Sequence, residues 1–211
     1  MMLELKNFRK AFGKELVLDV ESLLFDAGLH WIKGRNGSGK STLLACAAGI
    51  SPFQGDILLQ QKFHPLRHPE AYRSRVNFAE AEPLYPEFLC GRELFEFVAG
   101  AKKASSEQKD MLVTVYRLDA YFEKPAASYS SGMSKKLSLA MAFLGKPELI
   151  LLDEPFITLD HDGVAATSFL VDEYLKKGCS FLMSSHEEPS AGGLHPHFVY
   201  NIEAGTIRRS E

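Results

Sequence analysis

No stretch of about 18 uncharged apolar residues, the length that a membrane-spanning helix requires, occurs in the 211-residue sequence. The first residues contain neither the basic segment nor the apolar segment of a secretory signal. Long runs of one charge are also lacking, and 27 acidic against 24 basic residues give a net charge of −3. The basic pairs 102–103, 135–136 and 208–209 are interpreted as solvated surface. We therefore expect a protein that is neither exported nor embedded in a membrane by itself, with no nucleic-acid partner.

Cysteine is scarce. Cys46, Cys90 and Cys179 are far apart in the sequence and form neither a C-x-x-C pair nor a Cys/His cluster with zinc spacing. This distribution favours a reduced, cytosolic compartment. Two pairs of closely spaced histidines lie in loop-like sequence with prolines and without nearby partners, so the sequence does not favour a metal site built from histidines.

The composition and the apolar runs predict a single α/β domain. The chain has 211 residues, 45% of them hydrophobic, which is enough for one large domain and too little for two. Two almost wholly apolar runs, 149–152 and 179–183, resemble central parallel strands that are buried on both faces. Residues 164–177 between them are typical of a helix closed by Gly178, which predicts a right-handed crossover. The other strand-like segments are residues 2–5, 16–20, 29–33 and 55–59, and an edge hairpin of residues 198–202 and 206–208.

The middle of the chain favours helices. The second predicted helix begins behind a capping box formed by Ser105 and Gln108. The predicted helices are residues 92–101, 107–118 and 131–144. We therefore predict one domain, in which residues 1–87 and 146–211 form an α/β core and residues 88–145 form an inserted helical subdomain.

Residues 34–42, Gly-Arg-Asn-Gly-Ser-Gly-Lys-Ser-Thr, match the phosphate-binding loop G-x-x-x-x-G-K-[ST], between a predicted strand and a predicted helix. Glycines let backbone N–H groups approach phosphate oxygens closely, and the helix N-terminus that follows favours an anion. Lys40 is expected to reach the β- and γ-phosphates of a nucleoside triphosphate, and the Ser41 hydroxyl is expected to ligate Mg²⁺. The predicted nucleotide-binding residues of this loop are Gly34, Asn36, Gly37, Ser38, Gly39, Lys40, Ser41 and Thr42.

Two carboxylates follow the apolar run 149–152. Asp153 comes directly after the run and is expected to hold the Mg²⁺ shell. Glu154, one residue further on, can polarise a water for in-line attack on the γ-phosphorus. An apolar strand that ends in Asp-Glu is common in α/β proteins and by itself indicates little. It becomes informative here because the other motifs accompany it in a particular order.

The motifs occur in the order of the ATP-binding-cassette (ABC) ATPases, and the resemblance covers essentially the whole chain. The motifs are Gly34 to Thr42, Tyr129-Ser130-Ser131-Gly132-Met133, Asp153-Glu154-Pro155, Leu159-Asp160 and Ser184-Ser185-His186. The resemblance implies an α/β fold of the P-loop NTPase type, with a mixed-sheet core, antiparallel N-terminal strands and an inserted helical subdomain. It also implies an ATPase that uses ATP and Mg²⁺.

The resemblance also implies roles for individual residues. Ser130 and Gly132 lie in the family signature, usually Leu-Ser-Gly-Gly-Gln, which caps a helix directed at the γ-phosphate on a second subunit. His186 matches the switch histidine that contacts the γ-phosphate and orients Glu154, so it is predicted to be catalytic together with Glu154 and Lys40. Asp160 matches the loop that couples the two sites of the dimer. Phe12 matches the aromatic residue that stacks on adenine.

The sequence departs from the family pattern in two places. Where relatives carry a glutamine that senses Mg²⁺ and the attacking water, Glu80 aligns with the position, and Glu82 is the second candidate. A carboxylate can still ligate Mg²⁺. Ser131 and Met133 replace signature residues. These changes bear on the rate of hydrolysis and not on nucleotide binding.

The resemblance implies a peripheral subunit on the cytoplasmic face of the cell membrane, which powers a membrane-spanning transporter subunit and pairs with an identical or different second ABC subunit. The chain is too short for the regulatory domain of many importer cassettes, which favours an exporter. The alternatives are a soluble ABC ATPase without a transport role, or the regulatory half of a heterodimer. Seven apolar residues could line a groove for the membrane subunit, although a helix core is the more common place for Leu94 and Phe97. The seven are Leu84, Tyr85, Phe88, Leu89, Leu94, Phe95 and Phe97.

Overall fold

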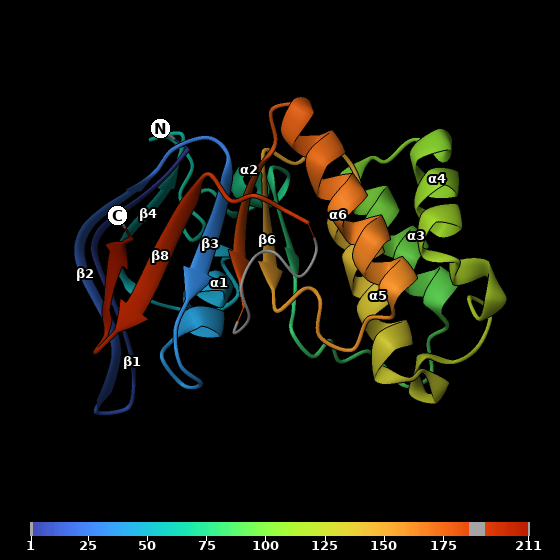
Figure 1. Cartoon of the computed structure of the whole chain (residues 1–211), viewed down its shortest axis with the longest axis horizontal. Helices are drawn as coiled ribbons and strands as arrows, with labels where there is room; N and C mark the ends of the chain where they lie inside the picture. Colours follow the sequence, from blue (N-terminus) through green and yellow to red (C-terminus); the bar gives the residue numbers. More distant parts are fainter. Residues whose placement is uncertain (1, 186–192, 211) are drawn as a thin grey trace.

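The computed structural model describes residues 2–185 and 193–210, so the predicted site residue His186 lies outside the described residues. Within these ranges the chain forms two sheets and a group of helices (Figure 1). The two sheets lie together in the half of the molecule that contains both termini, and the long helices pack on the other side of the central sheet. This arrangement confirms the predicted α/β class.

The central sheet has six strands in the order β5-β6-β7-β3-β8-β9. All neighbouring pairs are parallel except β8 and β9, which form the predicted antiparallel edge hairpin. Every residue of β6 and β7 is buried, as expected for central strands covered on both faces. The strands are β3 (Leu29–Lys33), β5 (Val76–Ala79), β6 (Leu149–Asp153), β7 (Ser180–Ser184), β8 (Phe198–Glu203) and β9 (Thr206–Arg209).

β5 is a correction to the sequence analysis, whose predicted strands do not include it. The strand has only four residues and contains the polar Asn77, so no apolar run marks it. Asn77 is nevertheless buried, and its Nδ2 donates hydrogen bonds to the carbonyl oxygens of Ala142 at 2.7 Å and Leu144 at 2.8 Å. These acceptors are far away in the sequence, so the partners that allow a buried amide are not visible locally.

The second sheet is antiparallel, with strands β1 (Leu3–Phe12), β2 (Glu15–Phe25) and β4 (Gln54–Leu59) in the order β2-β1-β4. β1 and β2 are about twice as long as the sequence predicts. In β1 a bulge shifts the alternation of apolar residues between Lys6 and Arg9. Asn7 in this bulge has φ of +46°. A Cβ at Gly55 would lie 2.0 Å from the Asn7 carbonyl oxygen, so only glycine fits opposite the bulge.

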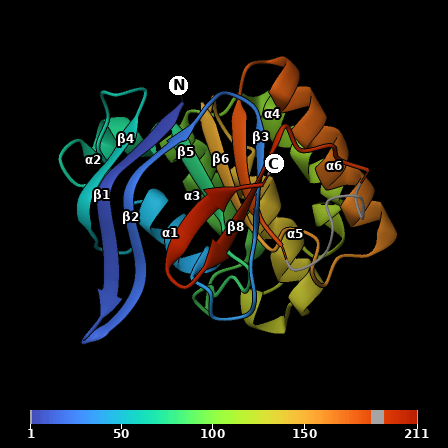
Figure 2. The same cartoon turned by 60° about the vertical axis from the view of Figure 1, so that its left-hand side comes forward.

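Helices cover both faces of the central sheet. α1 packs between the two sheets in one apolar cluster (Figure 2), and the helical subdomain and α6 pack in the other. Ser105 Oγ caps α4 by accepting a hydrogen bond from Gln108 N, but the Gln108 side chain does not complete the predicted capping box and bonds Phe143 O, Gly145 O and Tyr174 Oη instead. The helices are α1 (Lys40–Ala47), α2 (Pro69–Arg73), α3 (Gly91–Lys102), α4 (Ser106–Tyr116), α5 (Ser131–Ala142) and α6 (His161–Lys176).

His30 is a buried titratable group at the start of β3. Its Nε2 donates a hydrogen bond to the Asp26 carbonyl oxygen at 2.8 Å, and its ring stacks on Phe198 with centroids 4.8 Å apart. Burial lowers the pKa of His30 from 6.5 to about 4, and nearby His197 and Arg209 act in the same direction. The folded protein therefore holds His30 neutral.

This burial predicts acid sensitivity. Because the pKa of His30 is lower in the folded chain than in the unfolded chain, the unfolded chain binds the proton first, and the free energy of unfolding falls between pH 6.5 and about 4 by up to about 3 kcal/mol. His30→Gln keeps an N–H donor but does not titrate. The free energy of unfolding of this variant, measured by chemical denaturation at each pH, should therefore change less steeply with pH than that of the parent. His195→Gln, at an exposed histidine, is the control and should keep the parental slope. An equal slope in His30→Gln and the parent would assign the acid sensitivity to other groups.

Candidate functional site

The predicted phosphate-binding loop connects β3 to α1. Gly37 and Gly39 have φ of +76° and +105°, and Gly39 is the N-cap of α1. A Cβ at Gly34 would lie 2.4 Å from Ser38 Oγ, so the loop closes tightly on itself. Ser38 Oγ is buried and has no hydrogen-bond partner among the described residues. Positive φ angles, a helix N-terminus and an unpaired hydroxyl in one loop fit the binding of phosphate oxygens.

Lys40 is the first residue of α1 and is only 5% exposed. Its Nζ donates a hydrogen bond to the Gly34 carbonyl oxygen at 2.9 Å and lies 3.9 Å from Glu154 Oε1. Burial lowers the pKa of Lys40, and the charges of Glu154 and Asp153 oppose this shift. The lysine therefore joins the glycine loop to the carboxylates at the end of β6.

Ser184, the last residue of the neighbouring strand β7, bonds the carboxylate of Asp153 and the backbone of Glu154. The Ser184 hydroxyl donates a hydrogen bond to Asp153 Oδ1 and accepts one from Glu154 N at 3.1 Å. Asp153 and Glu154 are both buried, and Glu154 has φ of +45°, which is uncommon for a residue with a side chain. Ser184 is a site residue to which the sequence analysis assigns no role. The signal that identifies it is the register of β6 and β7, which places Asp153 opposite Ser184.

The signature segment contacts the loop that follows Glu154. Ser130 caps α5, since its Oγ accepts a hydrogen bond from Met133 N at 3.2 Å. A Cβ at Gly132 would lie 2.8 Å from the Thr158 carbonyl oxygen, so the first turn of α5 rests directly on this loop. At the end of the loop Asp160 caps α6, accepting a hydrogen bond from Gly163 N at 2.8 Å.

A neighbouring lysine stabilises the ionised carboxylate of Asp160. Lys136 Nζ donates a hydrogen bond to Asp160 Oδ2 at 2.8 Å, and this contact lowers the pKa of the carboxyl group. Asp160 itself is largely exposed, with 61% of its side chain accessible. α5 is thus linked to the loop 154–160 by a carbonyl contact at one point and by an ion pair at another.

The remaining predicted residues lie on the surface. Phe12 is 56% exposed at the end of β1, with Lys10 Nζ 4.3 Å from its ring centroid. Asn36 and Ser41 are exposed, Thr42 is half-buried, and Glu80 is exposed directly after β5. Among the described residues, no group of three or more His, Cys, Asp or Glu side chains could hold a metal ion together.

Lys135 is a second residue that the sequence analysis misses, and its interpretation as solvated surface is wrong. The side chain is 0% exposed. Its Nζ donates hydrogen bonds to the carbonyl oxygens of Glu80 at 2.7 Å, Ala81 at 3.2 Å and Asp153 at 2.7 Å. No local pattern marks this burial, because all three acceptors come from other parts of the chain.

A glycine loop between a parallel strand and a helix, with a buried lysine beside carboxylates at the end of another strand of the sheet, defines a nucleotide-binding site of the P-loop NTPase class. Comparisons with known proteins narrow this class. A family model described as ABC transporter matches residues 19–157. The ABC-type transporter ATP-binding protein EcsA of Bacillus subtilis is 34% identical over 213 residues, which cover 98% of this chain and 85% of the relative.

Two further relatives differ in the direction of transport that their names give. The tungstate uptake system ATP-binding protein TupC of Peptoclostridium acidaminophilum is 28% identical, over 100% of this chain and 99% of its own. The cytochrome c biogenesis ATP-binding export protein CcmA of Haemophilus influenzae is 27% identical, over 91% of this chain and 92% of its own. A solved structure of an ATP-binding subunit of an ABC transporter superposes with a TM-score of 0.88 at 26% identity, covering 100% of this chain and 90% of that chain.

The chain belongs to the ABC transporter family and is an ATPase of the ATP-binding-cassette type. Its fold is that of the family, with the antiparallel sheet at the N-terminus and the helices α3 to α5 inserted between β5 and β6. The match to the family model spans the phosphate-binding loop, the signature segment and the end of β6, whereas Phe12, Asp160 and Ser184 lie outside the matched residues.

The bridge made by Ser184 leads to a test. Ser184→Ala removes the donor to Asp153 and the acceptor of Glu154 N, and should lower the free energy of unfolding by about 1–3 kcal/mol and kcat for ATP by about tenfold. Ser180→Ala is the matched control, because Ser180 Oγ accepts a hydrogen bond from Gly28 N at 3.1 Å at the opposite end of the same strand. This control should be destabilised but keep the parental kcat. Equal kcat values for the two variants would contradict a role of Ser184 in the site.

Proposed function

We propose that this chain is the ATP-hydrolysing subunit that powers an ABC membrane transporter from the cytoplasmic face of the membrane, through ATP-driven closure of a dimer. The observation that carries the catalytic part is the proximity of Lys40 Nζ and Glu154 Oε1, 3.9 Å apart, between the glycine loop and the end of β6. Such an arrangement suits positioning and electrostatic stabilisation of a transferred phosphoryl group.

The residues present fit ATP and Mg²⁺. The glycine loop and the N-terminus of α1 would hold the triphosphate, and Lys40 would leave the Gly34 carbonyl oxygen to bind the β- and γ-phosphates. Ser41 and Asp153 would hold Mg²⁺, which supplies neutralisation of the phosphate charge. Glu154 would orient and polarise the attacking water, and His186 would assist it at the γ-phosphate. Phe12 offers an exposed ring for stacking on adenine.

Glu80 would be the third residue near Mg²⁺, in place of the family's glutamine. Its side chain is exposed, whereas its carbonyl oxygen accepts the hydrogen bond from Lys135 Nζ at 2.7 Å. The backbone is therefore fixed while the carboxylate remains accessible to a cation. A carboxylate at this point adds negative charge beside Asp153, which suits a divalent cation better than a neutral site would.

The catalytic role of Glu154 can be tested by a change that removes only the charge. Glu154→Gln should lower kcat by about 100-fold or more, because a neutral amide cannot act as the base, while equilibrium binding of ATP is retained. Phosphate release and binding of labelled ATP measure the two effects. Glu148→Gln, at the partly exposed residue just before β6, is the control and should hydrolyse ATP like the parent. Hydrolysis at the parental rate by Glu154→Gln would refute the assignment.

The second subunit, identical or different, would bind head to tail and place its own signature helix over this nucleotide. Ser130 and Gly132 are the residues of this chain that would face the partner's γ-phosphate. Their position at the N-terminus of a helix of 12 residues supports this role, since α5 begins there with the exposed residues Ser130 and Ser131. Asp160 would couple the two sites, through the loop against which Gly132 packs.

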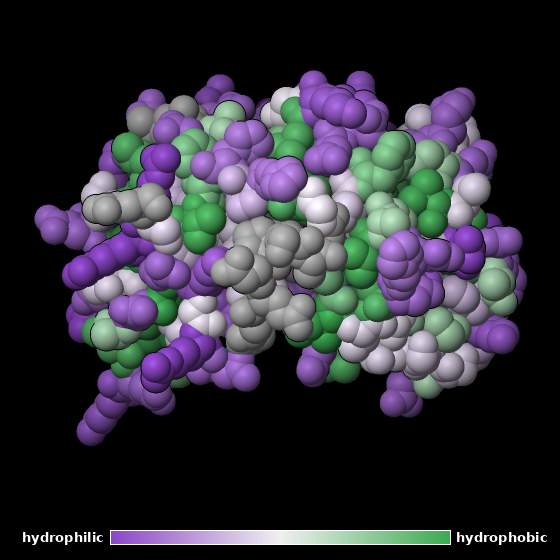
Figure 3. Space-filling model, in the orientation of Figure 1, coloured by the Kyte–Doolittle hydropathy of each residue, from purple (hydrophilic) through white to green (hydrophobic). Residues whose placement is uncertain are grey.

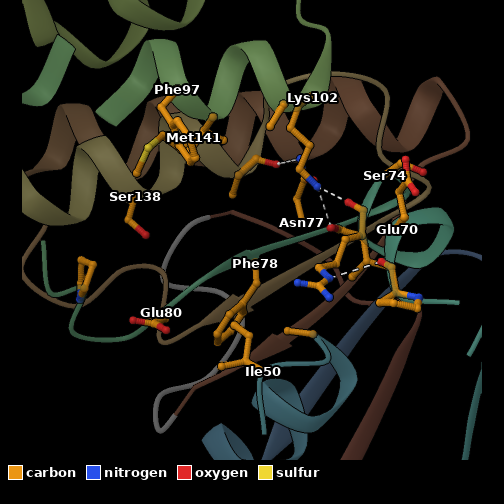
Figure 4. Close-up of a pocket in the computed structure, with 18 of the residues that line it drawn as sticks. Ile50, Glu70, Ser74, Asn77, Phe78, Glu80, Phe97, Lys102, Ser138 and Met141 are labelled. Atoms are coloured by element: carbon orange, nitrogen blue, oxygen red, sulfur yellow. Dashed lines mark hydrogen bonds between the residues drawn. The ribbon is translucent and has the colours of Figure 1, made fainter. Parts of the chain in front are cut away.

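A cavity of about 1150 Å³ lies between the helices and the core, and it supports docking of a membrane subunit. Figure 4 shows Phe97 and Met141 on the helical side and Ile50 and Phe78 on the opposite side. Leu84 is 92% exposed at this cavity. A short amphipathic helix from the cytoplasmic part of the transporter would place its apolar face here.

Two expectations for this cavity need correction. Phe97 is 79% exposed at the cavity, so its assignment to a helix core is wrong. Phe95, considered above for the groove, is 0% exposed and belongs to the core.

The face of the molecule in Figure 3 is mainly polar, with smaller groups of apolar residues. Within the described ranges, no helix has the length and apolarity required to cross a membrane.

The transport role can be tested by co-purification. Tagged protein recovered from gently solubilised native membranes should carry a stoichiometric multi-spanning protein. Phe97→Glu should reduce this recovery by about tenfold, because docking of the membrane subunit would bury the new carboxylate. Phe169→Glu is the control, at a phenylalanine of α6 that is 56% exposed and outside the cavity. Recovery only in the soluble fraction, with ribosomes or with no partner, would favour a non-transport ATPase.

The proposed direction is export. The H. influenzae relative named as an export protein supports it, while the tungstate relative is named for uptake. Since the transported molecule is bound by the membrane subunit, the sequence of the co-purified protein assigns both the direction and the substrate.

A further inference from the structure

Lys135 uses all three N–H groups of its ammonium on backbone carbonyl oxygens. The acceptors are Glu80 O at 2.7 Å, Ala81 O at 3.2 Å and Asp153 O at 2.7 Å. The side chain is 0% exposed. A buried lysine is costly unless its hydrogen bonds are satisfied, and here they are satisfied without a carboxylate as direct partner.

The three segments that meet at this atom belong to different parts of the catalytic apparatus. Lys135 lies in the second turn of α5, the helix capped by Ser130 in the signature segment. Glu80 and Ala81 follow β5, and Asp153 ends β6 directly before Glu154. Because one nitrogen bonds both strand ends, α5 cannot shift relative to the core without lengthening at least one of these hydrogen bonds.

The charge of Lys135 also matters. The charges of Asp153, Glu154, Glu80 and Glu82 all favour its protonated form, while burial opposes it and lowers the pKa of Lys135 to about 8. Four carboxylates near one edge of the sheet repel one another, and a buried cation between their backbones offsets that repulsion.

Other polar residues tie the helical subdomain to the rest of the chain without reaching the site. Lys102 Nζ donates hydrogen bonds to Val76 O at 3.1 Å and to Arg73 O, at the amino end of β5. Gln108 Nε2 bonds Phe143 O and Gly145 O, beyond the carboxyl end of α5. Lys135 differs from both because its acceptors lie at the carboxyl edge of the sheet, beside Glu154.

From this geometry we infer that Lys135 is a positioning residue for ATP hydrolysis, which transmits the position of the signature helix to the Glu80 loop and to the Asp153–Glu154 edge. It does not touch the nucleotide. The inference rests on the proposed role of Glu154. When α5 is seated, the two strand ends are aligned, and when it moves, the carboxylates move with it.

The test compares kcat with ATP affinity. Lys135→Met keeps the length of the side chain but removes the donors and the charge, and should lower kcat at least tenfold while the Kd for ATP changes less than about twofold. Lys135→Gln, which retains an N–H₂ group, should recover part of kcat. Gln108→Met is the matched control, because it removes hydrogen bonds to carbonyl oxygens at the other end of α5, and it should keep the parental kcat per ATP-binding site.

Hydrogen exchange gives a second readout. In Lys135→Met the amides of residues 80–82 and 154–156 should exchange faster than in the parent, and in Gln108→Met they should not. The inference would be overturned if Lys135→Met kept the parental kcat, or if its activity fell only in proportion to the number of ATP-binding sites lost. Unchanged hydrogen exchange in both segments of Lys135→Met would also overturn it. If Glu154→Gln remains fully active, the proposed function fails. If Glu154→Gln is inactive and Lys135→Met is not, only the inference about Lys135 fails.

Discussion

The parallel register of β6, β7 and β3 is the constraint on which the site depends. Asp153 lies opposite Ser184, and Ser184 lies opposite Ile32, so β6 and β7 end at the same level and β3 ends one residue further on. Glu154, which follows β6, and the phosphate-binding loop, which follows β3, therefore share a single edge of the sheet. A shift of one residue would turn every side chain to the opposite face and would separate the lysine from the carboxylates. The apolar residues that fill both faces of β6 and β7 thus determine the geometry of the polar edge.

A second theme is the use of side chains to satisfy distant backbone carbonyls. Asn77, Lys102, Gln108 and Lys135 each donate to carbonyl oxygens of other segments, and together they connect the helical subdomain to the core. Hydrogen bonds of this kind have defined geometry, so they specify one arrangement more sharply than apolar contacts do. They also differ in place: Lys102 and Lys135 bond to opposite ends of β5, at Val76 and after Ala79.

The parts of the structure that could be predicted from the sequence are those determined by local spacing. The phosphate-binding loop needs its glycines and lysine within nine residues, and the buried strands β6 and β7 appear as apolar runs. β5, Ser184 and Lys135 could not be found in this way, because the groups that explain them are 18 to 67 residues away along the chain. The bulge at Asn7 hides the true length of β1 for a related reason, since it interrupts the alternation of apolar residues.

The backbone of the loop after β6 contains two residues in the left-handed region, Glu154 at φ +45° and Thr158 at φ +66°. Each residue with a side chain in that region costs about 1 kcal/mol relative to glycine. Selection for stability alone would therefore favour glycine at both positions. At Thr158 the exchange would remove no carboxylate, whereas at Glu154 it would remove one that lies beside Lys40. The backbone strain at Thr158 can therefore be removed by substitution, whereas the strain at Glu154 is retained together with its carboxylate. Engineering for thermostability should begin at Thr158.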